Sequence, residues 1–155
     1  MKGEAVPDPD HVARYVRRSH VDDGRVVGNA FLRKRNPNEP APSVHWLEVL
    51  AGQVHDQIAE VRRRNRLGKG AMAVFARLNV GRTRRYVADN DADHRQIAFI
   101  HDPLDAKPPE HPLDDPSHAL IEGLPHPDDT PEAEAIGDLI CETVLDTFPA
   151  RAAAE

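Results

Sequence analysis

Five β-strands are predicted along this chain, two of them from alternating side chains and one from a compact apolar run. Alternation with period two fits a strand with one buried face, because successive side chains point to opposite sides. The predicted strands cover residues 11–17, 26–32, 74–80, 96–101 and 118–124. Asp22-Asp23-Gly24 accepts the backbone angles of a tight turn, so the first two strands are expected to form a hairpin.

Apolar residues at spacings of three and four predict a long amphipathic helix over residues 44–66. Ser43 precedes it and suits the N-cap position, because a serine hydroxyl accepts a hydrogen bond from the free N–H groups of the first turn. Trp46, in the first turn, is expected to anchor the core or an interface. His45 and His55 of the same helix are expected at the surface.

Two further helices are predicted in the second half of the chain. A short one covers residues 83–88. The last begins at Thr130, with Pro131 in its first turn, where a missing N–H costs nothing. The apolar stripe of this last helix continues to Phe148, and Pro149 ends it.

The order of these elements predicts one α+β domain over residues 1–155. We expect a mixed β-sheet of about five strands, with two main helices and one short helix packed on it. Residues 1–10 form an N-terminal extension and residues 150–155 a tail. Residues 103–116 contain five prolines, which lack the N–H donor that helices and central strands need. They are expected to form a long ordered loop between two strands.

The composition indicates the cellular compartment in which the protein is expected. Its single cysteine, Cys141, cannot form an intramolecular disulfide. Apolar neighbours, with Asp138 and Glu142 close by, predict a small core residue and not a reactive thiol. No apolar run approaches the roughly 18 residues of a membrane span, and residues 1–10 lack the apolar centre of a signal peptide. A cytoplasmic protein with no membrane partner is therefore expected.

Charge is distributed unevenly along the chain. Residues 1–90 carry 17 Lys and Arg against 10 Asp and Glu, whereas residues 91–155 carry 3 against 16. Guanidinium groups gathered near one edge would hold phosphates, of nucleic acid or of another anion. The residues of this basic cluster are Arg62, Arg63, Arg64, Arg66, Lys69, Arg82, Arg84 and Arg85. The alternative is that these cations stabilise a helix C-terminus and pair with the acidic half.

The strongest candidate for a catalytic site is the segment that starts at His101 and ends at His118. His101, Asp102 and His118 fall at the ends of two predicted strands, on either side of the proline-rich loop. Imidazole and carboxylate groups suit a general acid–base pair or a divalent metal. No ligand spacing such as His-Glu-x-x-His is present, so no metal-binding residues are assigned. The alternative is that the two Asp-Pro pairs of this segment only begin turns.

A second constellation is Arg14, Ser43 and Glu122, each on or beside a predicted strand. This order resembles the motif of ADP-ribosyltransferases, in which arginine and serine hold NAD and glutamate polarises the ribose. Position 120 is Leu120, so the acid that usually stands two residues before the glutamate is missing. The alternative is a surface arginine, a helix cap and a solvated acid.

Four segments together resemble a family of small bacterial proteins of unassigned function. They are Arg14-Tyr15-Val16 with Asp22-Asp23-Gly24, Ser43-Val44-His45-Trp46-Leu47-Glu48, Ala76-Arg77-Leu78-Asn79-Val80-Gly81, and His101-Asp102-Pro103 with Asp115-Pro116-Ser117-His118. The resemblance covers most of the chain. It implies no activity and no cofactor.

Three functions are compatible with these features. The first is a small binding or accessory module, a subunit of a larger bacterial system whose partner is another protein. The second is a small enzyme that acts on a phosphate- or ribose-bearing substrate, with His101 or His118 as general acid or base and Asp102 orienting it. The third is nucleic-acid binding through the basic cluster. Walker, Gly-x-Gly-x-x-Gly, Cys-x-x-Cys and Gly-x-Ser-x-Gly motifs are absent, so the sequence names no cofactor.

Overall fold

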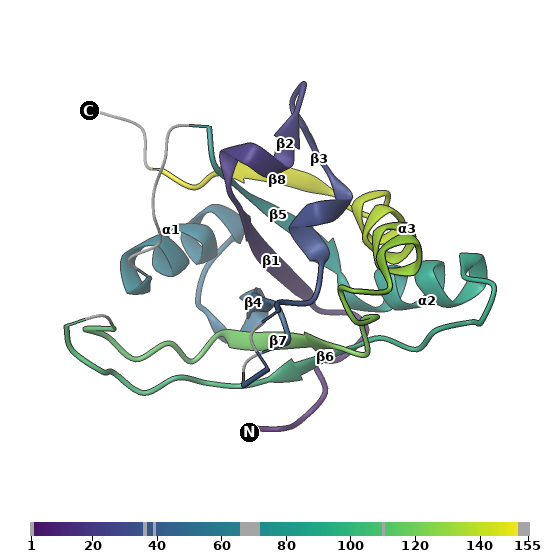
Figure 1. Ribbon diagram of the computed structural model, residues 1–155. Helices are drawn as coiled ribbons and strands as arrows, with labels where there is room; N and C mark the ends of the chain where they lie inside the picture. Colours follow the sequence, from purple (N-terminus) through teal and green to yellow (C-terminus); the bar gives the residue numbers. More distant parts are fainter. Residues whose placement is uncertain (1, 36, 39, 66–71, 110, 152–155) are drawn as a thin grey trace.

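A six-stranded β-sheet forms the centre of the fold (Figure 1). The computed structural model describes residues 2–35, 37–38, 40–65, 72–109 and 111–151. The strand order is β6-β7-β4-β1-β5-β8, and each neighbouring pair in it is antiparallel. These strands are β1 His11–Val16, β4 Ser43–Trp46, β5 Val74–Asn79, β6 Ala98–His101, β7 His118–Glu122 and β8 Asp146–Pro149.

In the parts of the chain that the structure describes, three α-helices cover the two faces of this sheet, so the predicted α+β class is confirmed. They are α1 Val54–Arg64, α2 Val80–Asn90 and α3 Thr130–Cys141. Figure 1 shows α1 on one side of the sheet and α2 with α3 on the other. Within the described residues, no helix has the length and apolar character needed to cross a membrane.

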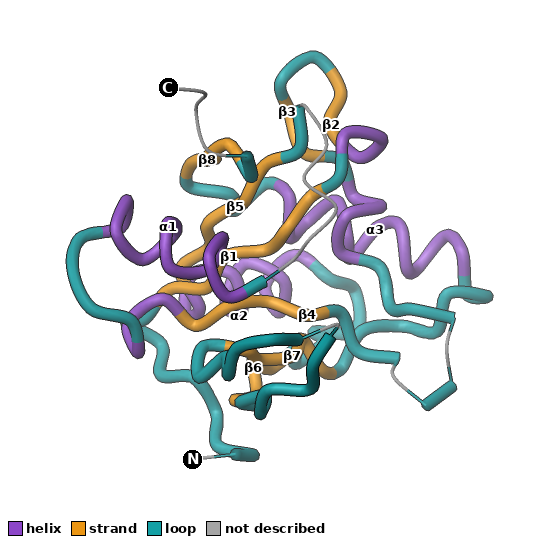
Figure 2. Tube along the Cα trace, turned by 90° about the vertical axis from the view of Figure 1, so that its left-hand side faces the viewer, coloured by secondary structure: helices purple, strands orange, loops and turns teal. Residues whose placement is uncertain are grey.

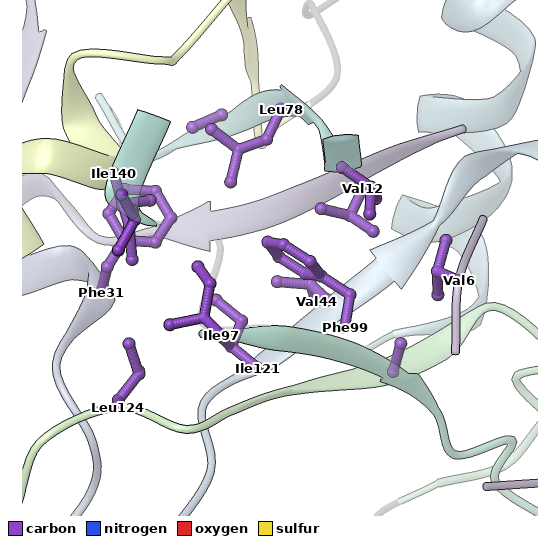
Figure 3. Packing of buried hydrophobic residues seen from close by; sticks show 14 of the residues in the cluster. Val6, Val12, Phe31, Val44, Leu78, Ile97, Phe99, Ile121, Leu124 and Ile140 are labelled. Atoms are coloured by element: carbon purple, nitrogen blue, oxygen red, sulfur yellow. The ribbon is translucent and has the colours of Figure 1, made fainter. Parts of the chain in front are cut away.

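Each face of the sheet carries its own hydrophobic cluster. The larger lies under α2 and α3 and includes Val12, Phe99 and Ile121 (Figure 3). The smaller lies under α1 and includes Ala13 and Phe75. Neighbouring residues of β1 thus belong to different clusters, because side chains alternate across a strand. The same alternation decides which polar side chains of the other strands meet.

The predicted strands 11–17, 74–80, 96–101 and 118–124 are confirmed to within a few residues. The predicted strand 26–32 is wrong, since Gly28–Phe31 form a short 3-10 helix. Only β3, Arg25–Val26, pairs with β2, Val21–Asp22, in a small two-stranded ribbon that projects from the molecule (Figure 2). Its turn is the predicted one, because Asp23 and Gly24 have φ angles of 49° and 76°. The predicted hairpin with residues 11–17 is wrong, however, since β1 pairs with β4 and β5.

The predicted helix 44–66 is wrong over residues 44–53, since Ser43–Trp46 form β4 and α1 starts only at Val54. The apolar spacing there continues through a 3-10 turn at Leu47–Val49. Tertiary pairing overrides the helical spacing, because β4 lies between β1 and β7 and hydrogen-bonds to both. Ser43 is therefore the first residue of a strand and not a helix cap.

The last helix is shorter than predicted. Pro131 lies in the first turn of α3 as expected, but α3 ends at Cys141 and Phe148 belongs to β8. The Thr143 hydroxyl donates to the carbonyl of Ile140 at 2.7 Å, just beyond the end of the helix. The chain then turns back, and β8 pairs with β5 as an edge strand.

The proline-rich segment joins two strands that are neighbours, β6 and β7, as predicted. Its two arms run side by side, with bridges between Leu104 and Asp115 and between Lys107 and His111. In Figure 1 these arms extend to the left, below α1. Part of the N-terminal extension covers the outer edge of β6, where Ala5 bridges to Ile100.

A close contact between two glycines predicts the effect of one substitution. A Cβ on Gly137 of α3 would lie 2.5 Å from the carbonyl oxygen of Gly28. Gly137→Ala is expected to lower the free energy of unfolding by about 1–3 kcal/mol through overpacking. Elsewhere in a helix, replacing glycine by alanine normally raises this free energy by about 1 kcal/mol. Urea unfolding measures the difference. The control Ala135→Gly, at an exposed position of α3, is expected to lose only about 1 kcal/mol. A Gly137→Ala variant as stable as the parent would contradict this packing.

Candidate functional site

Three polar side chains from neighbouring strands meet on the α1 side of the sheet. Ser43 is the first residue of β4, His118 the first of β7, and Asp102 directly follows β6. β4 pairs with β7 so that Ser43 opposes Leu120 and His45 opposes His118. Ser43 and His118 are therefore diagonal neighbours on one face, a distance that a serine and an imidazole span.

Hydrogen bonds determine which nitrogen of the His118 ring carries the proton. Its Nδ1 lies 2.8 Å from the carbonyl oxygen of Asp102 and 3.3 Å from the carboxylate Oδ2 of the same residue. Both are acceptors at neutral pH, so Nδ1 carries the proton. Nε2 lies 3.0 Å from the Ser43 Oγ and accepts its proton in a hydrogen bond. His118 therefore presents a lone pair to a serine hydroxyl, which is the tautomer that a general base requires.

Burial keeps His118 neutral. Its side chain is only 11% exposed, and this burial is the main cause that lowers its pKa below 6.5. The hydrogen bond and charge of Asp102 act in the opposite direction and raise the pKa, but they do not outweigh burial. The imidazole is thus uncharged at pH 7, as a base must be before it takes up a proton.

The three residues line a cavity of about 740 Å³. Its walls come from the N-terminal extension, the loop before β4, residues 102–107 and His111 of the proline-rich arms, and β7. The lining residues are Lys2, Lys34, Asn38, Pro40, Ala41, Ser43, Asp102, Pro103, Leu104, Asp105, Lys107, His111, His118, Leu120 and Glu122. Cations and anions both occur on the wall, so the cavity suits a polar ligand of small-molecule size.

His101 does not join this group, although its strand lies beside that of His118. His101 pairs with Ala119, so its side chain lies on the opposite face of the sheet from His118. Its ring packs edge-on against Trp46 at 5.0 Å, and its Nε2 lies 2.7 Å from the carbonyl oxygen of Pro116. The predicted trio is thus divided, with Asp102 and His118 together and His101 apart.

The constellation of Arg14, Ser43 and Glu122 is also divided by the sheet. Ser43 and Glu122 line the cavity, but the Arg14 side chain lies on the α2 and α3 side. There it donates from Nε to Ala30 and from Nη1 to the backbone oxygen of Ser43, at 2.9 and 2.7 Å. Burial lowers the pKa of Arg14 to about 10. Arg14 is half-buried and holds the backbone of Ser43 from behind, so it does not face a ligand in the cavity.

The basic cluster does not form one edge. Arg62, Arg63 and Arg64 lie on α1, whereas Arg82, Arg84 and Arg85 lie on α2, across the sheet (Figure 1). Several of these cations also have partners in the fold: Glu60 binds Arg63 and Arg64, and Asp8 binds Arg84. Arg66 and Lys69 lie outside the described residues. The single anion-binding edge expected from the sequence is therefore absent from the described parts of α1 and α2.

Cys141 behaves as predicted for a residue of the core. It is partly buried and packs against the larger hydrophobic cluster. Burial, with the charges of Asp138 and Glu142, raises the pKa of its thiol to about 12. In the described part of the chain, no group of three or more His, Cys, Asp or Glu side chains is placed to hold a metal ion.

A buried polar network beside the cavity was not predicted. Asp115 is 0% exposed, and its carboxylate accepts three hydrogen bonds, from the Ser117 backbone N–H, the Ser117 hydroxyl and the Asn65 side-chain amide. The His45 Nδ1 lies 3.2 Å from the Asp115 Oδ2 and also 3.2 Å from the Ser117 Oγ, with which it forms a hydrogen bond. His45 is 4% exposed, which overturns the expectation of a surface residue. The missed signal was Ser43-x-His45, the period-two spacing of a strand inside an apparent helical stripe.

The charge of Asp115 is stabilised by this network. Burial alone would raise its pKa, but His45, Ser117 and Asn65 more than offset this and hold the pKa well below the ordinary 3.8. A carboxyl whose pKa is lower in the folded state stabilises the fold above its unfolded pKa and loses that effect as the pH falls. Asp115 therefore contributes to stability throughout the neutral range.

Asp115→Asn tests this assignment. We expect the variant to lose about 3 kcal/mol of unfolding free energy at pH 7, because donors then face an amide instead of a carboxylate. The difference from the parent is expected to shrink as the pH falls below about 4, where the parent's carboxyl begins to protonate. Chemical denaturation at several pH values measures it. Asp105→Asn, at an exposed position of the same segment, is the control and should stay within about 0.5 kcal/mol. A loss that is constant with pH would contradict a charged Asp115.

No protein-family model, curated protein or solved structure matches this chain. The feature of this chain that most directly indicates a function is the contact between Ser43 and His118.

Proposed function

We propose that this protein is a small enzyme that transfers or hydrolyses a polar ester by nucleophilic catalysis. Ser43 is the nucleophile, His118 the general base, and Asp102 the group that orients the imidazole. The observation that carries the proposal is the hydrogen bond of 3.0 Å from the Ser43 hydroxyl to the His118 Nε2, on the wall of a cavity. A serine, an imidazole and a carboxylate in this relation recur in unrelated folds that perform acyl transfer.

The reaction follows from the protonation state of the site. The Ser43 Oγ attacks the ester carbon while its proton passes to the His118 Nε2. The imidazolium, held at Nδ1 by Asp102, then gives that proton to the departing alkoxide, and an ester of Ser43 remains. Water or a second alcohol attacks this ester and gives its proton to the same nitrogen, and the imidazolium then returns that proton to the departing Ser43 Oγ.

The wall of the cavity supports a polar substrate with an anionic group. Lys34 and Lys107 contribute ammonium groups from two different loops, and Asn38 adds an amide. Ammonium groups recognise phosphate and carboxylate as point charges. A volume of about 740 Å³ holds a molecule of the size of a nucleotide or sugar phosphate. This is compatible with the phosphate- or ribose-bearing substrate expected from the sequence.

The environment of Asp102 favours a second candidate function, binding without chemistry. Its Oδ1 lies 3.5 Å from the Lys2 ammonium, while its Oδ2 faces His118. A carboxylate that also interacts with a lysine stabilises an imidazolium less strongly than a carboxylate that interacts with the imidazolium alone. In that case the cavity serves the binding or accessory module expected from the sequence. A protein or nucleic-acid partner remains a prediction.

Covalent labelling distinguishes the two candidates. A fluorophosphonate probe is expected to modify the parent protein at Ser43, as peptide mass spectrometry would show, because the probe reacts with activated serines. Ser43→Ala should abolish labelling, and His118→Gln should slow it by about 100-fold or more, the usual contribution of a general base. Ser19→Ala, at an exposed serine, is the matched control and should react like the parent. A parent protein that is not labelled would leave only the binding function.

The pH dependence of labelling follows from the lowered pKa of His118. The base acts only when neutral, so the rate should rise with pH with a midpoint below that of an ordinary histidine, 6.5. Asp102→Asn should move the midpoint lower still, because the Asp102 charge raises this pKa. Labelling rates measured between about pH 4 and about pH 8, a range that includes the titration of imidazoles, provide the test. A midpoint above 6.5 would contradict the neutral base.

A further inference from the structure

His45 and Asp115 form a buried pair that the proposed reaction does not use. His45 Nδ1 lies 3.2 Å from the Asp115 Oδ2, and the two side chains are 5% and 0% exposed. A substrate in the cavity therefore cannot reach either group. A buried charge is costly to maintain, so a pair of this kind calls for a structural or functional explanation.

The pair connects three separate parts of the chain at one point. His45 belongs to the central strand β4, and Asp115 to the second arm of the proline-rich segment. Asn65, at the end of α1, donates to the same carboxylate at 3.1 Å. The backbone N–H of Trp46 donates to the Ser117 carbonyl at 2.7 Å, which continues the contact between β4 and the arm. The arm is therefore fixed on the sheet one residue before His118.

His118 is the side chain next to this pair. It opposes His45 directly across the two strands, and the two rings lie edge-to-face with centroids 6.2 Å apart. Its own Nε2 reaches Ser43, two residues before His45 on the same face of β4. A shift of the arm along β4 would move the His118 ring out of reach of the Ser43 hydroxyl, because a slip of one residue turns every side chain to the other face.

The charges of the pair also act on His118, in opposite directions. A positive His45 lowers the pKa of His118, whereas the carboxylate of Asp115 raises it. Burial also lowers the pKa of His118, and the contacts with Asp102 raise it. The other charged or titratable groups around the cavity are Lys2, Lys34, Asp105, Lys107, His111 and Glu122.

We propose that His45 and Asp115 are positioning residues, which hold His118 in hydrogen-bonding register with Ser43. The inference deepens the proposed function and rests on it only in treating His118 as the base. His45 acts through the register of β4 and β7, and Asp115 through the attachment of the proline-rich arm. Neither touches the reacting atoms.

Two substitutions of His45 separate its hydrogen bond from its imidazole ring. His45→Gln keeps an N–H donor for Asp115 and removes the imidazole, whereas His45→Phe removes both. Labelling of Ser43 by the fluorophosphonate is expected to fall by about 100-fold in His45→Phe, the effect of a small misplacement of reacting groups. His45→Gln should restore most of that rate. A His45→Phe variant that is folded and labelled as fast as the parent would overturn the proposal.

The pKa of His118, followed by NMR of its imidazole in the full chain, provides a readout that a merely structural role would not move. It should rise in His45→Gln and fall in Asp115→Asn, because the two charges act in opposite directions. If Asp115→Asn does not fold, the two His45 variants test the proposal on their own. An unchanged pKa in His45→Gln would overturn the electrostatic part of the proposal. A parent whose Ser43 never reacts, but whose His118 pKa shifts as stated, would refute the proposed function and leave the positioning role standing.

Discussion

The pairing of β4 with β7 is the contact on which the rest of this molecule depends. β4 lies between β1 and β7 in the middle of the sheet, and its register places His45 opposite His118. Ser43 consequently lies within hydrogen-bonding distance of the same histidine. A slip by one residue would exchange the faces and bury Val44 where His45 now lies. The apolar residues of β4 thus enforce the arrangement of its polar ones.

Burial of Asp115 adds a second constraint to this register. A carboxylate without exposure is tolerated because Ser117 and Asn65 donate hydrogen bonds to it and the His45 imidazole lies beside it. Removing one donor leaves the charge partly unsatisfied, at a cost of about 1–3 kcal/mol. The network therefore favours a single position of the proline-rich arm over neighbouring ones. That arm also supplies part of the wall of the cavity, so the same bonds determine its shape.

The sheet separates two kinds of buried polar group. On the α1 side, Ser43, His118 and Asp102 border a cavity that a ligand can enter. On the other side, Arg14 donates to backbone carbonyls beneath Ser43, and His101 packs against Trp46. Only the first set combines a nucleophile and a base at a position that a ligand can reach. The second set supports the strands that carry it, which explains why candidate residues that are neighbours in the chain have different roles.

Local patterns in the sequence determined much of the fold. Alternation predicted β1 and β5, and proline density predicted an irregular connection between β6 and β7. Those features depend on residues close together in the chain, whose sterics and periodicity are encoded locally. Asp102 and His118 could be selected as a candidate pair for the same reason, since they flank that connection.

Only the tertiary structure decided that Ser43 and His45 lie on a strand. Their apolar neighbours fit a helical spacing equally well, and hydrogen bonding to β1 and β7 resolved the ambiguity. Tertiary structure also turned His101 away from His118, because the face that a side chain occupies depends on strand register. Register is set by partners far along the chain. A local pattern therefore shows which residues belong to a strand, while long-range packing decides which of them meet.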